Sequence, residues 1–398
     1  MRKEGIFMKR RTTILLKTAF LIGLIFSLLL SVEGKPLQAA EPIKIGVILS
    51  ITGRGGFLGT PEKEAIAAVV EEVNSKGGLF ARQIELYFED DQSNPTNSAV
   101  AATKLIRDKK VCCLLGSSLV VGCMAILPIC EREEVVQIAL APISIPYKKW
   151  TFCVPVTDYR LAQRMLKFTV ETLGARKIAL LHSTDTYGMN GAQGVIDTID
   201  KHGASLIITE KFEPTDTSMI PQLTKVKAAR PEAIILYANA VPASVIAKNC
   251  RQLGLETPVV GGGGIPTPDF LKLAGQIAEA GRWVIFGLED LYADRMPPDD
   301  PYRKNLYDPV MKAIQEKYGK TEWNGFYRNG YDPIRIAIEA LKIAGTDDRA
   351  ALRDALEKVR FKGFLGDFKY SPTDHEGTLG EAFVPVVIRE GKYSPYKK

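Results

Sequence analysis

The sequence predicts an α/β protein with two doubly wound parallel-sheet lobes, and three observations lead to this class. Short apolar runs rich in β-branched residues alternate with segments of helical periodicity, which is the pattern of strand–helix–strand units. The alternation runs through four predicted strands, stops at a connection over 150–158, and then begins again. The chain has 398 residues, and the part that follows residue 40 is longer than one hydrophobic core usually takes.

The first lobe begins with Ile43–Leu49 (IKIGVIL), whose continuous apolar and β-branched character is typical of a buried parallel strand. A glycine-rich turn over 52–56 follows, and apolar residues at helical spacing then predict a helix over Pro61–Val73. The other predicted elements of this lobe are strands at Ile84–Phe88, Val111–Leu115 and Val135–Leu140 and helices at Pro95–Arg107 and Cys123–Glu133.

The second lobe repeats the scheme after the connection at Trp150–Asp158. Its predicted strands are Lys177–His182, Ser205–Glu210, Ala233–Tyr237 and Pro258–Val260, and its predicted helices are Gly191–His202, Met219–Ala229 and Ala243–Leu253. We expect the strand Trp283–Gly287 and the helix Tyr331–Ala344 to return to the first lobe.

Open parallel sheets bind ligands beyond the carboxyl ends of their strands. The sequence therefore predicts a cleft lined by six loops. These loops follow Leu49, Leu115, Leu140, His182, Tyr237 and Val260.

The first 40 residues predict an export signal. Lys9, Arg10 and Arg11 precede an apolar run over 18–32, and small residues end the segment at Ala39 and Ala40. This order is typical of a secretory signal peptide, and the run is shorter than the roughly 20 residues of a spanning helix. We expect a periplasmic protein, although a retained anchor at 18–32 stays open as an alternative.

Charge excludes one class of partner. The formal net charge of +6 falls to +1 once seven basic and two acidic residues of segment 1–40 are removed. No basic patch is left that would favour nucleic acid, and no second long apolar run favours a membrane span.

No catalytic or metal-binding pattern stands out. The three histidines do not form a Ser/His/Asp or zinc-type arrangement, and the glycines after the first strand lack the order of a nucleotide-binding loop. The six cysteines lack paired C-x-x-C spacing, and their apolar neighbours favour buried structural thiols over disulfides. We therefore expect neither an enzyme nor a cofactor nor a metal site.

Several stretches carry a family resemblance, in order and over nearly the whole chain after residue 40. They are IKIGVILSITG (43–53), EEVNSKGGLFARQIELYFEDDQSNP (71–95), KIALLHSTDTYG (177–188), CRQLGLETPVVG (250–261) and GYDPIRIAIEALKIAG (330–345). The chain resembles the leucine/isoleucine/valine-binding protein family, the type I periplasmic binding proteins of branched-chain amino-acid ABC importers.

The resemblance implies a three-stranded hinge between the lobes. It places the first lobe at 41–153 and 281–380 and the second at 154–280 and 381–398, after a signal peptide at 1–40. It also implies a monomer that carries a small-molecule solute to an ABC permease in the inner membrane.

In family members that bind amino acids, the loop after the third strand offers hydroxyls to the ligand carboxylate. Here those positions hold Val120, Val121 and Gly122, with Ser118 slightly earlier, and Ile143 replaces the hydroxyl of the next loop. The ligand-binding candidates in the loops of the first lobe that the resemblance points to are Ser118, Val121, Ala141 and Ser144, and Phe57 is a further candidate as an aromatic wall.

The second-lobe candidates are Tyr187, Asn239 and Gly263. Tyr187 matches the family, Asn239 stands where a tyrosine is usual, and Gly263 stands where an acid holds the ligand ammonium. A buried ammonium without a carboxylate partner costs several kcal/mol. We also expect the four glycines at 261–264 to leave room for a ring or a longer chain.

These replacements favour a small aromatic or aliphatic carboxylate as the solute, held by backbone N–H groups or by an arginine such as Arg54, Arg160 or Arg328. An amino acid or amide stays open as an alternative, with Asp158 or Glu289 supplying the missing anchor. A ligand-sensing protein that feeds a receptor, an extracytoplasmic enzyme and an anchored ectodomain are the other classes considered.

Overall fold

The computed structural model describes residues 41–143, 147–279, 282–378 and 380–397. The expected export signal at 1–40 lies outside the described residues. Within the described ranges, no helix has both the length and the apolar character that crossing a bilayer requires.

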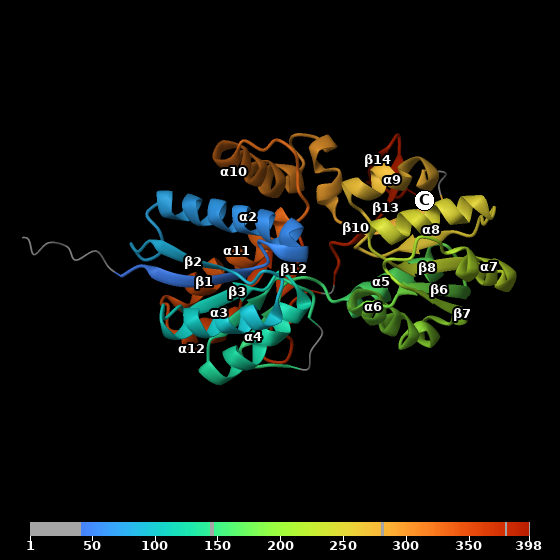
Figure 1. Cartoon of the computed structure of the whole chain (residues 1–398). Coiled ribbons are helices and arrows are strands. Elements are labelled where there is room, and N and C mark those ends of the chain that lie inside the picture. The colour runs from blue at the N-terminus through green and yellow to red at the C-terminus, as the bar shows by residue number, and fades with distance from the viewer. Residues whose placement is uncertain (1–40, 144–146, 280–281, 379, 398) are drawn as a thin grey trace, which may run out of the picture. The chain divides into compact units, whose positions relative to one another are not determined.

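The first sheet has five parallel strands in the order β2-β1-β3-β4-β5 (Figure 1). Its strands are β1 (Ile43–Leu49), β2 (Ile84–Asp90), β3 (Cys113–Gly116), β4 (Val136–Ala139) and β5 (Thr151–Cys153). The helices that pack around it are α2 (Gly56–Ser75), α3 (Pro95–Arg107), α4 (Val120–Glu133), α10 (Asp308–Tyr318), α11 (Tyr327–Ala344) and α12 (Arg349–Leu356).

The alternation of side chains along β1 explains why helices cover both faces of this sheet. Ile43, Ile45 and Val47 share a core with α2 and α11, whereas Ile48 points into the core under α3 and α4. A strand that is buried on both faces reads as a continuous apolar run, because each face needs its own apolar side chains.

The second sheet has seven strands in the order β14-β13-β10-β9-β8-β6-β7. Five strands are parallel: β6 (Lys177–Ser183), β7 (Ser205–Phe212), β8 (Ala233–Tyr237), β9 (Val259–Gly261) and β10 (Trp283–Gly287). Two antiparallel strands extend it, β13 (Val384–Arg389) and β14 (Lys392–Pro395). Its helices are α5 (Asp158–Glu171), α6 (Thr186–Ile196), α7 (Ile220–Ala229), α8 (Ala240–Gln252) and α9 (Pro268–Ala278).

Short elements complete the chain. They are η1 (Gly53–Gly55), η2 (Ile199–His202), η3 (Glu289–Leu291), η4 (Ala293–Arg295), the π-helical turn η5 (Arg303–Tyr307), and the hairpin of β11 (Arg360–Lys362) and β12 (Asp367–Lys369).

The fold class predicted from the sequence is confirmed: the protein is α/β, with two sheets whose parallel strands alternate with helices. The described chain passes between the elements of the two sheets three times, after β5, after β10 and before β13. One expectation is wrong. Trp283–Gly287 does not return to the first lobe, because β10 pairs with β9 and β13 inside the second sheet.

The cysteines agree with the expectation of buried thiols. All six are buried and none forms a disulfide. In the described part of the chain, no group of three or more His, Cys, Asp or Glu side chains is arranged to hold a metal ion.

Candidate functional site

The loops at the carboxyl ends of the parallel strands form the candidate site, which has one half on each sheet. On the first sheet these loops follow β1, β3 and β4, and α2 and α4 begin there. On the second sheet they follow β6, β8 and β9, and α6 and α8 begin there. Helix N-termini present unpaired N–H groups and a partial positive charge, which favours an anionic group nearby.

A buried carboxyl group organises the loops of the first sheet. Asp91 accepts hydrogen bonds from the hydroxyls of Ser50 at 2.7 Å, Ser98 at 2.8 Å and Ser117 at 2.6 Å, and from the Ser93 N–H at 2.8 Å. Both carboxyl oxygens are therefore saturated by the protein. Asp91 holds the loops after β1 and β3 together and is not free to bind a solute.

Ser118 lies next to this network, between β3 and α4. Its hydroxyl accepts a hydrogen bond from the Ser50 N–H at 3.0 Å and lies 2.5 Å from Glu62 Oε2 of α2, to which it donates when Glu62 is ionised. Both residues are buried, with exposed fractions of 5% for Ser118 and 0% for Glu62. Burial, opposed by the Ser118 hydrogen bond and helped by the nearby Asp91 charge, raises the pKa of Glu62 to about 8.

Apolar side chains stand at the surface of the same edge. Phe57, in the first turn of α2, is 63% exposed and contacts Phe326 edge-on at 5.6 Å between ring centres. Val121, in the first turn of α4, is 39% exposed. Arg54 is exposed nearby in η1, and its side chain makes no hydrogen bond or ion pair with the described residues. The accessible part of this half-site thus combines apolar surface with one cation.

The loop after β4 exposes fewer candidate side chains than the sequence indicated. Ala141 and Ile143 are 3% and 1% exposed and lie in a small apolar core with Cys123, Ala139 and Cys153. Their side chains are therefore core residues and do not form an open wall. Ser144 lies outside the described residues.

On the second sheet, Tyr187 is half-buried at the start of α6. Its hydroxyl oxygen accepts a hydrogen bond from the Gly264 N–H at 3.0 Å, and its ring packs against Tyr237 at 5.5 Å. Burial raises the pKa of the Tyr187 hydroxyl well above its usual value, so this group stays protonated. Its proton has no acceptor among the described residues and can be donated to a solute.

The expectation that the glycines at 261–264 create open volume is wrong, because the protein fills that volume with other side chains. A Cβ atom at Gly262 would lie 2.7 Å from the Tyr187 hydroxyl, and one at Gly264 would lie 2.5 Å from Asn239 Oδ1. A Cβ atom at Gly263 would lie 2.8 Å from the Phe383 ring. The glycines are needed because Tyr187, Asn239 and Phe383 approach the backbone closely.

The side chains around Gly263 are apolar, whereas the family resemblance places an acid at that position. Besides Phe383, the Leu161 methyl group would lie 3.3 Å from a Cβ atom at Gly263. Position 263 therefore faces apolar groups. Asn239 is exposed at the start of α8, where its side chain makes no capping hydrogen bond, so its amide is accessible.

The half-site on the second sheet also contains an acid, Asp158, at the start of α5. It is 6% exposed, and its backbone carbonyl accepts a hydrogen bond from the Tyr237 hydroxyl at 3.1 Å. Burial, together with the charge of Asp185 and against a hydrogen bond from the Asn190 side chain, raises the pKa of the Asp158 carboxyl to about 8. No cation pairs with this carboxyl among the described residues.

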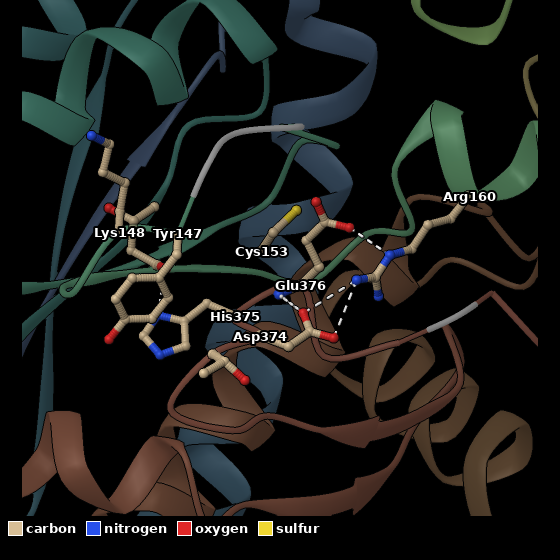
Figure 2. Close-up of a pocket in the computed structure, with 9 residues that line it drawn as sticks. Tyr147, Lys148, Cys153, Arg160, Asp374, His375 and Glu376 are labelled. Carbon is tan, nitrogen blue, oxygen red and sulfur yellow. Dashed lines mark hydrogen bonds and ion pairs between the residues drawn. The ribbon is translucent and has the colours of Figure 1, made fainter. Parts of the chain in front are cut away.

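Two of the three arginines proposed from the sequence are engaged within the protein. Arg160 pairs with Asp374 at 3.2 Å and Glu376 at 2.6 Å (Figure 2), and Arg328 pairs with the buried Asp290. A solute acid would have to displace these carboxylates. Of the three candidates, Arg54 alone keeps its guanidinium available.

The Arg160 pairs lie in a cavity of about 300 Å³ that is lined from the end of the loop after β4, from β5, from α5 and from the segment 373–376. Figure 2 shows His375 between these ion pairs and Tyr147. The His375 ring stacks on Phe152 at 3.8 Å and contacts Tyr147 at 4.7 Å, and its nitrogens lie 3.1 Å from the Thr151 carbonyl and 3.4 Å from Glu357. Tyr147, at the end of the loop after β4, therefore lines this cavity.

Sequence reasoning missed Glu62. Its position carries a usable signal, because Glu62, Ile66 and Val69 share one helical face at spacings of four and three residues and all three are buried. A carboxyl group on the apolar face of a helix is uncommon unless it is paired or functional.

Comparisons with known proteins agree with this architecture. A family model described as "Periplasmic binding protein" matches residues 42–391. The chain is 23% identical over 340 residues to Leu/Ile/Val-binding protein homolog 3 of Brucella melitensis, which covers 84% of this chain and 89% of that one. It is 24% identical over 352 residues to the leucine-, isoleucine-, valine-, threonine- and alanine-binding protein of Pseudomonas aeruginosa, with 86% and 88% covered.

Among solved structures, an extracellular ligand-binding receptor from Rhodopseudomonas palustris HaA2 superimposes with a TM-score of 0.76 at 26% identity. The superposition covers 89% of this chain and 99% of that one. The family model covers the first sheet, the second sheet except β14, and the three passages between them. The chain belongs to the periplasmic binding protein family.

Proposed function

We propose that this protein is the solute-binding component of an ABC importer and that its solute is a small aromatic or aliphatic carboxylate. The site comprises the two sets of strand-end loops, with Phe57, Ser118 and Val121 on the first sheet and Tyr187, Asn239 and Gly263 on the second. Its partner is a permease, and it acts as an exported monomer. We place the second lobe at 154–287 and 381–398, so that β10 stays with its sheet.

The observation that carries the ligand class is the apolar surroundings of Gly263. Where the family resemblance places an acid, this chain has Phe383 and Leu161 against the backbone. An ammonium group withdrawn from water at that point would lose its hydration without gaining a partner. A carboxylate without an ammonium avoids this cost.

The first-sheet half supports a lone acid group. Arg54 is free to pair with a carboxylate, and α2 and α4 both begin at this edge. Phe57 and Val121 add apolar surface for a ring or an alkyl chain. An anion with an apolar body fits these features together.

A branched-chain amino acid is the second candidate, and Asp158 favours it. This carboxyl is buried close to Tyr187 and has no cation among the described residues, so a ligand ammonium could supply one. The names of the relatives from Brucella melitensis and Pseudomonas aeruginosa point to the same class of solute.

Calorimetry separates the two candidates. Benzoate and 3-methylbutanoate are titrated beside leucine, isoleucine and phenylalanine, with the wild-type protein and with Asp158→Asn. We expect binding of at least one acid and retention of that binding in Asp158→Asn. Micromolar binding of leucine that is lost in Asp158→Asn, with neither acid bound, would establish the amino-acid candidate instead.

A further inference from the structure

Glu62 joins α2 to the loop after β3 through the Ser118 hydroxyl. Its Oε2 is 2.5 Å from the Ser118 hydroxyl, and its Oε1 is buried without a hydrogen-bond partner among the described residues. A buried ionised carboxylate needs partners for both oxygens, whereas the carbonyl oxygen of a neutral acid tolerates the lack of one far better. The geometry around Glu62 therefore suits the neutral acid.

The protonation state of Glu62 decides the direction of the Ser118 hydroxyl. A serine hydroxyl has one proton to donate and two lone pairs that accept. When Glu62 is ionised, Ser118 must give its proton to Oε2. When Glu62 is neutral, its own proton occupies that contact, and the Ser50 N–H at 3.0 Å occupies the other lone pair. The Ser118 hydroxyl can then donate its proton in a hydrogen bond to an acceptor outside the protein.

The groups around Glu62 leave this acid without a compensating cation. The charge of Asp91 acts against a second negative charge at Glu62. The Cys123 thiol, whose pKa burial raises to about 12, is neutral and supplies no cation. From α11 the backbone at Gly330 faces the Glu62 backbone, and from β1 the Ser50 hydroxyl is bound to Asp91. The nearby lysines Lys317 and Lys320 pair with Glu71 and Glu64 instead.

We infer that Glu62 is a positioning residue for the solute. In its neutral form it turns the Ser118 hydroxyl into a donor directed at the solute carboxylate. This inference rests on the proposed function, because it requires a solute carboxylate that binds beside the loop after β3. When Glu62 ionises, the Ser118 hydroxyl donates to Glu62 and no longer to the solute. The new negative charge also repels the solute carboxylate, so both effects weaken binding.

The test is the pH dependence of benzoate binding, because benzoate stays fully ionised between pH 7 and 9. Apparent affinity scales with the neutral fraction of Glu62, so a group that titrates near pH 8 lowers affinity about tenfold at pH 9. Asp158 titrates in the same range. The comparison is therefore made in the Asp158→Asn background, in which the remaining dependence belongs to Glu62.

Glu62→Gln keeps a donor toward Ser118 and cannot ionise, so we expect it to bind benzoate with nearly constant affinity from pH 7 to 9. Ser118→Ala should weaken binding at pH 7 and also flatten the profile. The matched control is Glu64→Gln, two residues along the same helix and paired with Lys320, which should retain the wild-type profile.

A readout without solute separates this inference from the proposed function. Carbon NMR of labelled glutamate, assigned by comparison with Glu62→Gln, should show a carboxyl that titrates near pH 8. Titration near 4.5 overturns the inference, as does a wild-type binding profile in Glu62→Gln. A titration near 8 without binding of benzoate or 3-methylbutanoate overturns the carboxylate ligand, and with it the donor role of Ser118, but not the neutral state of Glu62.

Discussion

The hydroxyl oxygen of Tyr187 accepts a hydrogen bond of 3.0 Å from the Gly264 N–H, which ties the loop after β6 to the loop after β9. The two residues are 77 positions apart in the sequence. The same side chain thus holds the glycine loop in place, and we propose that it also donates its hydroxyl proton in a hydrogen bond to the solute.

Replacement of Tyr187 should separate the two roles. We expect Tyr187→Ala to weaken solute binding by about 1–3 kcal/mol, because the ring and the hydroxyl both leave the site. Tyr187→Phe keeps the ring against Tyr237 and should lose only about 1 kcal/mol. Calorimetry measures both, and circular dichroism checks the fold. Wild-type affinity in Tyr187→Ala would remove this residue from the site.

An acid placed at 263 should not create an amino-acid site on its own. Since a Cβ atom there would lie 2.8 Å from the Phe383 ring, we expect Gly263→Asp to lower the free energy of unfolding by about 1–3 kcal/mol without leucine binding. The double variant Gly263→Asp with Phe383→Ala relieves the clash and should recover part of that stability. Urea denaturation and leucine titration provide the two readouts. Full stability in the single variant would show that Phe383 does not enforce the glycine.

Stability should fall as pH rises from about 5 to 8. Burial is the main cause that raises the pKa values of Glu62 and Asp158 to about 8 and that of Asp332 to about 7. Between the unfolded and folded pKa values, the folded chain holds protons that the unfolded chain has released. Each of these acids then lowers the free energy of unfolding by up to about 1.4 kcal/mol per pH unit. This decrease ends once the pH exceeds the pKa that the acid has in the folded chain.

Urea denaturation at pH 5, 6, 7 and 8 checks this slope. Glu62→Gln should give a shallower slope by about one proton, whereas Glu64→Gln should keep the wild-type slope. Stability that is constant or rises over this range in the wild-type protein would contradict the prediction.

Arg160 should contribute to stability through its two partly buried carboxylate partners, Asp374 and Glu376. Burial raises the pKa of Glu376 and the Arg160 charge opposes that rise, so removal of the guanidinium leaves a poorly compensated acid. We expect Arg160→Met to cost about 2 kcal/mol, and Arg160→Met with Glu376→Gln to cost less than the single change. A double-variant cycle by urea denaturation measures the coupling. Additive effects would mean that the pair contributes nothing.

The fold was predictable to the extent that local patterns determine it. Runs such as Ile43–Leu49 and Ala233–Tyr237 are buried on both faces, so their apolar character alone identifies them. The sheet to which Trp283–Gly287 belongs depends on its pairing with β9 and β13, which no local pattern records. β5 is only three residues long and was hidden within a predicted connection.

The site was less predictable, because its shape depends on side chains far apart in the sequence. The sequence gives four glycines at 261–264, but only the structure shows that Tyr187, Asn239 and Phe383 occupy the space beside them. Likewise, the family resemblance makes Ser118 a candidate through its place near the hydroxyl positions of the loop after the third strand. Its dependence on Glu62, 56 residues earlier, follows only from the packing of α2.

The antiparallel pairing of β10 with β13 has a consequence for the order in which the molecule is completed. A ribosome makes the chain from its N-terminus, and the strands of the first sheet have all been synthesised once Cys153 is added. The second sheet must wait for Val384–Pro395, and Gly263 must wait for the Phe383 ring. A translation product interrupted before residue 383 therefore contains every strand of the first sheet and still lacks two strands of the second, together with the ring that packs on Gly263.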